Sequence, residues 1–299
     1  MNADKLPSYG GQALIEGVVM RGEFAVAAAM RAPDGTIVLH TEELDKIYQS
    51  KLKTIPFIRG LIVLWDALGL GMRFLVLSAN VQTGEEQKLE KRELALTLLL
   101  SFVFMVLLFF WGPSELGNLV AKGFGLSDHT GILVEGLLRL FVVILYLWGI
   151  GKAPDINRVF AYHGAEHKTI NAYEAGADLV PEEVAKYPLE HPRCGTSFFV
   201  TLIVLSILIF TLLGPLPFLI RLVSRVILIP LMAGIAYEYI RWTANHLSSP
   251  WIRILIKPNL WLQSLTTREP TWGMLEVSIA AFKLMLKQEI ELKNKLRAT

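Results

Sequence analysis

The 299-residue chain contains a single cysteine, Cys194, and few charged residues. One cysteine cannot form an internal disulfide, so nothing in the sequence calls for an oxidising compartment. Only 19% of the residues are charged, against roughly 25% in ordinary soluble proteins, and 53% are hydrophobic, which excludes a disordered chain. The 29 Lys and Arg residues nearly balance the 27 Asp and Glu residues. Without an excess of positive charge, we expect no nucleic-acid partner.

Long apolar segments are what the chain has in abundance. Residues 94–111, 131–150, 196–213 and 226–242 are each long enough to cross a hydrocarbon core of roughly 30 Å. Residues 56–79 are also apolar, but Arg59, Asp66 and Arg73 interrupt them and two glycines lie near their middle, which favours a re-entrant or interfacial hairpin. The first 20 residues lack a basic start followed by an apolar run, so we expect no cleavable signal peptide. The sequence predicts a polytopic α-helical membrane protein with about four transmembrane helices, embedded in the lipid bilayer.

The distribution of Lys and Arg gives an orientation. With four spans, all but one of the Lys and Arg residues in the connecting segments fall on the same side as both termini. The positive-inside rule then places both termini and the loop of residues 152–195 in the cytoplasm.

The two ends of the chain differ from the apolar middle. Residues 13–20, 24–30 and 36–39 are typical of strands, with turn residues at 33–35, and they predict a small cytoplasmic β-meander within residues 1–54. Residues 275–296 carry apolar side chains at steps of three and four, which predicts an amphipathic helix in the cytoplasmic tail of residues 243–299. This helix could pack onto the protein's own cytoplasmic part or the membrane surface, or, with the β-region, dock a protein partner. The intervening units are the hairpin (55–80), two pairs of transmembrane helices (92–151 and 196–242) and the loop (152–195).

The loop contains the pattern His-x-x-Glu-His, formed by His163, Glu166 and His167. The flanking residues favour a helix that ends near Gly176. On a helix the two histidines lie one turn apart on the same face, so both imidazoles can reach one metal ion, and Glu166 lies close enough to act as a general base on a metal-bound water.

A zinc site needs three or four protein ligands, and three further residues could complete it. His191 and Cys194 form a His-x-x-Cys pair in the same loop, and a thiolate binds zinc tightly. Glu238 lies near the cytoplasmic end of the fourth span, where a carboxylate needs a ligand, a salt bridge or water. The sequence leaves open which of the three binds the metal, and His246 is a weaker candidate.

Charged residues also occur within the predicted spans. Glu135 and Arg139 in one span lie at the depth of Arg221 and Arg225 in another. Opposite charges at matched depth neutralise each other, so we interpret them as structural ion pairs between helices.

Three blocks resemble a known family: residues 10–22, which begin Gly-Gly-Gln-Ala-Leu-Ile-Glu-Gly; residues 162–168, Tyr-His-Gly-Ala-Glu-His-Lys; and residues 191–198, His-Pro-Arg-Cys-Gly-Thr-Ser-Phe. Together they resemble the YqhQ-like bacterial membrane proteins, a domain of unknown function described as a predicted metal-dependent enzyme. This resemblance implies a bacterial cytoplasmic (inner) membrane. The His-x-x-Glu-His block also resembles the inverzincin metallopeptidases, in which a downstream glutamate is the third ligand, although here a membrane span separates Glu238 from the motif.

Two hypotheses of function follow. In the first, the protein is a membrane-embedded zinc-dependent enzyme, a hydrolase with Glu166 as catalytic base at the cytoplasmic face. In the second, a closed zinc site with four protein ligands makes the protein a non-catalytic scaffold that docks a cytoplasmic or membrane partner.

Overall fold

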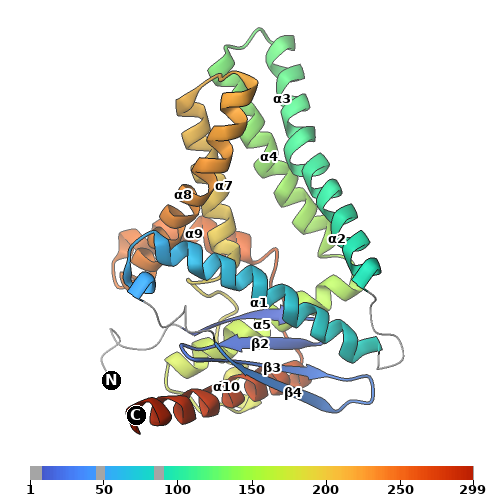
Figure 1. The fold of residues 1–299 in the computed structure, drawn as a ribbon, viewed down its shortest axis with the longest axis vertical. Coiled ribbons are helices and arrows are strands. Elements are labelled where there is room, and N and C mark those ends of the chain that lie inside the picture. The colour runs from blue at the N-terminus through green and yellow to red at the C-terminus, as the bar shows by residue number, and fades with distance from the viewer. Residues whose placement is uncertain (1–8, 45–50, 84–90, 299) are drawn as a thin grey trace.

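The computed structural model describes residues 9–44, 51–83 and 91–298. Figure 1 shows a bundle of long helices above a smaller part in which a β-sheet lies between helices. The elements in chain order are β1 (Gly10–Leu14), β2 (Gly17–Arg21), β3 (Ala25–Arg31), β4 (Ile37–Glu43), the 3-10 turn η3 (Lys51–Thr54), α1 (Ile58–Thr83), α2 (Lys91–Val106), the π-helical turn η5 (Leu107–Trp111), α3 (Gly112–Gly123), α4 (Asp128–Ile150), α5 (Pro154–Glu174), α6 (Pro181–Val184), α7 (Gly195–Leu213), α8 (Phe218–Asn245), α9 (Pro250–Gln263) and α10 (Trp272–Ala298).

Within the described residues, the strands form an antiparallel sheet in the order β1-β2-β3-β4, which confirms the predicted meander. The prediction of one strand over residues 13–20 is wrong, because a tight turn at Ile15 and Glu16 divides it into β1 and β2. Leu14 pairs with Gly17 across this turn, and Glu16 has a φ of 51°. The turn interrupts the alternation of side chains between the two faces of the sheet. The sequence does not show this interruption, because both faces are buried and apolar residues therefore occur on each of them.

Helices cover both faces of the sheet (Figure 1). On one face, Leu14 and Met30 pack around Phe74 of α1. On the other face, Met20 and its neighbours pack against α5 and α10. The sheet is therefore the middle layer of three, and α5 and α10 lie beside each other on the same face of it.

The bundle contains the apolar helices. In the part of the chain that the structure describes, five helices are long and apolar enough to cross a membrane: Ile58–Thr83, Ala95–Gly123, Asp128–Ile150, Gly195–Leu213 and Val223–Asn245. The last four include the four predicted spans almost entirely, and the second continues through η5 into α3, well beyond residue 111. Leu100, Phe104 and Leu212 expose more than half of their surface, as expected of side chains that face lipid.

The prediction of a hairpin at residues 55–80 is wrong, because α1 is one continuous helix. A single glycine inside a helix costs about 1 kcal/mol, which packing easily offsets. A Cβ at Gly71 would lie 2.3 Å from Oε1 of Gln12, so this glycine allows α1 to approach β1 rather than breaking the helix. In Figure 1, α1 runs across the axis of the bundle, between the bundle and the sheet.

The predicted ion pairing inside the bundle is confirmed for the side chains that are described. Arg139 donates to Glu135 at 2.5 Å, and Arg225 of α8 lies 3.4 Å from the same carboxylate. The side chain of Arg221 lies outside the described residues.

The C-terminal helix α10 packs on the sheet, which is one of the roles predicted for it: packing onto the protein's own cytoplasmic part. Its apolar residues, among them Leu275, Phe282 and Met285, are buried against the strands and α5. The carboxylate of Glu289 accepts hydrogen bonds from the backbone N–H groups of Glu23, Phe24 and Ala25. The apolar face of α10 is therefore covered by the chain itself, which favours packing over docking of a partner.

Candidate metal centre

The His-x-x-Glu-His pattern lies on α5, as predicted. Pro154 in the first turn suits the start of a helix, and Gly176, with a φ of 76°, lies just beyond its end. The rings of His163 and His167 lie one turn apart with their centroids separated by 4.4 Å. Both imidazoles therefore face the same space.

Backbone carbonyls fix the orientation of both rings. Nδ1 of His163 donates to the carbonyl of Thr266 at 2.8 Å, and Nδ1 of His167 donates to the carbonyl of Leu189 at 2.5 Å. Because a carbonyl can only accept, Nδ1 carries a proton in both rings, which makes Nε2 the nitrogen of each ring that can bind a metal. This is the arrangement by which proteins orient histidines that bind metals.

Cys194 brings a sulfur to the same place. It is the N-cap residue of α7, where its Sγ accepts a hydrogen bond from the N–H of Thr196 at 3.3 Å. Sγ also lies 3.3 Å from Nε2 of His163, close to the separation of about 3.5 Å that tetrahedral zinc imposes on a nitrogen and a sulfur ligand.

The three donor atoms of His163, His167 and Cys194 lie within 4.8 Å of one another. Small rotations of the side chains would bring all three to bonding distance from a common centre. Imidazole and thiolate are the donors that zinc prefers, so the residues fit this metal.

Glu166 is buried beside this cluster, with Oε2 3.8 Å from Nε2 of His163. Burial raises the pKa of its carboxyl to about 7, although His163 and the backbone N–H of Gly11 act in the opposite direction. A carboxyl with a pKa near neutrality can both accept and return a proton.

His191 is the other buried histidine of the site, and its ring lies 5.6 Å from that of His167. Gln263 holds its backbone on both sides, accepting from its N–H and donating to its carbonyl. Burial lowers the pKa of His191 to about 4, so the ring is neutral at physiological pH. Among the residues that the structure describes, Nε2 of His191 has no hydrogen-bond partner.

These side chains line one small, mostly enclosed cavity of about 70 Å³. Its walls come from the start of β1, from α5, and from the segment that leads into α7. The lining residues are Tyr9, Gly10, Gly11, His163, Glu166, His167, His191, Arg193, Cys194 and Gly195. The volume suffices for a metal ion and a coordinated water.

A family model described as "Protein of unknown function (DUF1385)" matches residues 55–288. The chain belongs to this family. A relative, "Uncharacterized protein YqhQ" from Bacillus subtilis (strain 168), is 35% identical over 300 residues, which cover 95% of this chain and 93% of the relative. No solved structure matches the chain. The resemblance to YqhQ-like proteins is therefore confirmed, and the matched range of the family model contains His163, His167, His191 and Cys194.

The structure does not bring Glu238 to the cluster, so its prediction as a ligand needs correction. Glu238 lies on α8, where it forms an ion pair with Arg59 of α1 and accepts a hydrogen bond from the N–H of Phe57. Its charge is neutralised there. His246 also lies elsewhere, with Nδ1 bonded to the carbonyl of Trp242 at 2.7 Å.

Two glycines in the family's sequence blocks matter to the site in ways that spacing alone did not reveal. A Cβ at Gly164 would lie 2.1 Å from the carbonyl oxygen of Arg268, so this glycine allows the segment that orients His163 to approach α5. A Cβ at Gly11 would lie 2.9 Å from Cγ of Glu166. Gly11 therefore allows β1 to pass close to the side chain of the candidate base.

Proposed function

We propose that this protein is an integral membrane, zinc-dependent hydrolase whose site lies where the apolar helices meet the sheet. The single observation that carries the proposal is the convergence of two oriented imidazole nitrogens and one sulfur on a cavity that also contains a buried carboxyl. Three protein ligands leave one position of tetrahedral zinc for water, which is the arrangement of catalytic sites.

His163, His167 and Cys194 would hold the ion, and bound zinc would make a coordinated water acidic enough to react near neutral pH. Glu166 would accept a proton from that water, since its carboxyl lies in the same cavity and is buried from solvent. Thr266 and Leu189 would keep the two rings in their ligating tautomer through their carbonyls.

The packing of the fold supports an orientation in the membrane. The sheet contacts both α5 and α10, so all three lie on one side of any bilayer that the bundle crosses. The chain must therefore cross the bilayer an even number of times between the sheet and α5, and again between α5 and α10. Two crossings, by α2–α3 and by α4, satisfy the first condition, and two crossings, by α7 and by α8, satisfy the second. If α1 also crossed, the sheet would be separated from α10. We infer that α1 lies along the surface and that both termini and the metal centre are on the cytoplasmic side of a bacterial inner membrane.

One observation favours the alternative, a non-catalytic scaffold with a closed zinc site. His191 lines the same cavity, and within the described part of the chain its Nε2 forms no hydrogen bond, with Oε2 of Glu174 3.9 Å away. As a fourth ligand, this nitrogen would fill the position that water needs. The two functions differ in the fate of His191, which is a ligand in the scaffold and only a neighbour in the enzyme.

The metal content of the purified protein tests the proposal. We expect about one equivalent of zinc by elemental analysis, lost in H163A, H167A and C194A. His246→Ala is the matched control, since His246 is outside the cavity and should leave the zinc in place. Zinc that survives in the first three variants would contradict the proposed site.

Two further variants separate the enzyme from the scaffold. Glu166→Gln should keep the zinc and the fold but abolish complementation of a deletion strain, because Gln cannot accept a proton. His191→Ala should keep the zinc if three ligands suffice. Full complementation by Glu166→Gln together with loss of zinc from His191→Ala would support the scaffold instead.

A further inference from the structure

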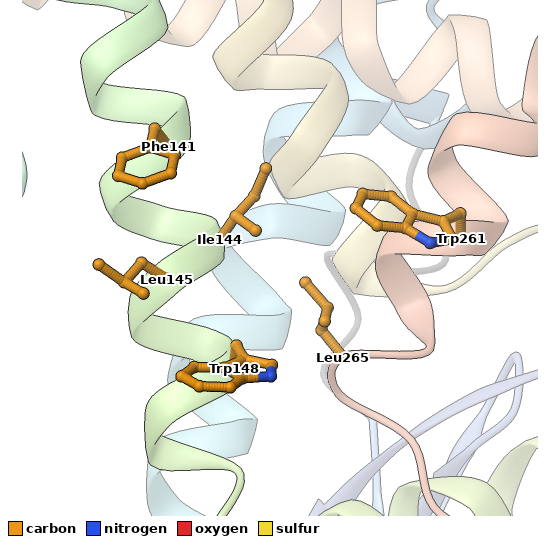
Figure 2. A pocket seen from close by; sticks show the side chains of 6 residues that line it. All are labelled: Phe141, Ile144, Leu145, Trp148, Trp261 and Leu265. Atoms are coloured by element: carbon orange, nitrogen blue, oxygen red, sulfur yellow. The ribbon is translucent and has the colours of Figure 1, made fainter.

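A second cavity is lined entirely by apolar side chains. It is an open groove of about 320 Å³, within the usual range for small-molecule sites. Figure 2 shows side chains of α4 on one side of the groove and residues of α9 and the turn after it on the other. The lining residues are Phe141, Ile144, Leu145, Trp148, Trp261 and Leu265.

The groove lies at the end of the bundle that faces the sheet. Its α4 residues come from the last three turns of that helix, which points toward the sheet in Figure 1. Trp148 and Trp261 are more than half exposed, and tryptophans of this kind collect at the boundary between hydrocarbon and headgroups. The open side of the groove therefore lies at the depth where lipid acyl chains join their headgroups.

Two cations lie where α4 ends, next to this groove. Nζ of Lys152 is 3.3 Å from the centre of the Trp148 ring. Nη2 of Arg268 would lie 3.0 Å from a Cβ on Gly151, which places its guanidinium at the same helix end. Among the residues that the structure describes, neither Lys152 nor Arg268 forms an ion pair with a carboxylate. Nη1 of Arg268 donates to the carbonyls of Ser264 and Thr267, which does not neutralise its charge. An apolar groove that ends in two cations without a carboxylate partner among the described side chains is complementary to a lipid with an anionic headgroup.

We propose that one anionic phospholipid binds here, with an acyl chain in the groove and its phosphate between Lys152 and Arg268. This site is distinct from the metal centre and does not depend on the proposed hydrolase activity. The two sites are adjacent in the chain, because Leu265 of the groove precedes Thr266, whose carbonyl orients His163. An occupied groove would therefore steady the segment that positions a candidate zinc ligand.

Native mass spectrometry of the full-length protein in mild detergent tests this site. We expect one bound molecule of phosphatidylglycerol, retained at least 10-fold more tightly than phosphatidylcholine. Leu145→Trp, which places a bulky ring in the groove at a half-exposed position, should abolish this binding. Leu137→Trp is the matched control, because Leu137 is equally exposed on α4 but does not line the groove. Lys152→Gln should remove most of the preference for phosphatidylglycerol.

Three results would overturn the proposal. Equal retention of phosphatidylglycerol and phosphatidylcholine by the wild-type protein would show that Lys152 and Arg268 do not select an anionic headgroup. Phosphatidylglycerol binding that survives Leu145→Trp, or that Leu137→Trp weakens to the same degree, would place the lipid outside the groove. A lipid-free dimer that Leu145→Trp dissociates would make a second copy of the chain the occupant.

Discussion

The position of a candidate ligand depends here on a residue without a side chain. Gly164 lies between the two histidines of α5, and the space that its Cβ would take is filled by the carbonyl of Arg268. That carbonyl belongs to the segment whose Thr266 accepts the Nδ1 proton of His163. Gly164 therefore allows the backbone that orients His163 to lie against α5.

We predict that Gly164→Ala weakens zinc binding although it removes no ligand. The new methyl group must push the 266–268 segment away, which costs about 1–3 kcal/mol of stability and disrupts the hydrogen bond that orients His163. Loss of such an outer partner lowers metal affinity about 10- to 100-fold. A zinc competition assay with a chromophoric chelator measures the affinity. Gly195→Ala is the control, because a Cβ at Gly195 meets nothing within 4 Å although the residue follows Cys194; equal affinity in both variants would contradict the role of Gly164.

The sequence predicts the donor side chains of the site better than their surroundings. Imidazoles and a thiol have a recognisable spacing, so the His-x-x-Glu-His pattern and Cys194 could be found without coordinates. The carbonyls of Thr266 and Leu189 could not, because every residue has a carbonyl and only the fold selects these two. Glu238 was misplaced for a related reason: its partner, Arg59, is distant in sequence and no pattern joins them.

At the scale of elements, α10 is joined to the sheet by one buried carboxylate as well as by its apolar face. Glu289 accepts three backbone hydrogen bonds at the connection between β2 and β3, at 3.1 to 3.3 Å. A Cβ at Gly22 would lie 2.4 Å from its Oε2, so the connection fits around this side chain. The carboxylate thus provides hydrogen-bond acceptors for backbone N–H groups at this connection.

We predict that Glu289→Gln destabilises the protein while Glu291→Gln does not. A buried amide donates as well as accepts, so one of its groups would face a backbone N–H without a bond, at a cost of about 1–3 kcal/mol. Glu291 is exposed on the same helix and provides a matched loss of charge. Thermal unfolding in detergent should show a midpoint lower by several degrees for Glu289→Gln only. Equal midpoints for the two variants would show that the apolar face alone fixes α10.

The elements themselves were largely predictable where hydrophobic periodicity is strong. The four apolar spans, the meander and the amphipathic C-terminal helix were all expected from their residues. The hairpin at 55–80 was wrong because charged residues and glycines in an apolar segment suggest a break, whereas in α1 they serve contacts. Gly71 leaves space for the side chain of Gln12, and Arg59 forms an ion pair with Glu238 of the bundle. Such contacts belong to tertiary packing, which outweighs local preference.

At the scale of the whole molecule, the contacts between distant parts of the chain constrain how it can cross a membrane. The sheet near the N-terminus, α5 in the middle and α10 at the C-terminus form one packed unit below the bundle in Figure 1. The connection between α3 and α4 lies at the opposite end of the bundle. The candidate metal centre includes His163 and His167 of α5, so it lies on the same side of the bundle as α10.

We predict that a membrane-impermeant maleimide distinguishes these two ends in intact protoplasts. Lys122→Cys, at the exposed end of α3, should react with the reagent outside the cell, while Lys287→Cys on α10 should react only after lysis. The wild-type chain controls for Cys194, which is buried and should react in neither condition. The expectation follows from the positive-inside rule, because most Lys and Arg residues of the connecting segments lie at the α10 end. If Lys287→Cys reacted in intact protoplasts and Lys122→Cys did not, the metal centre would face the cell exterior. If both variants reacted in intact protoplasts, the two ends of the bundle would lie on the same side of the membrane. The four-span arrangement would then be wrong.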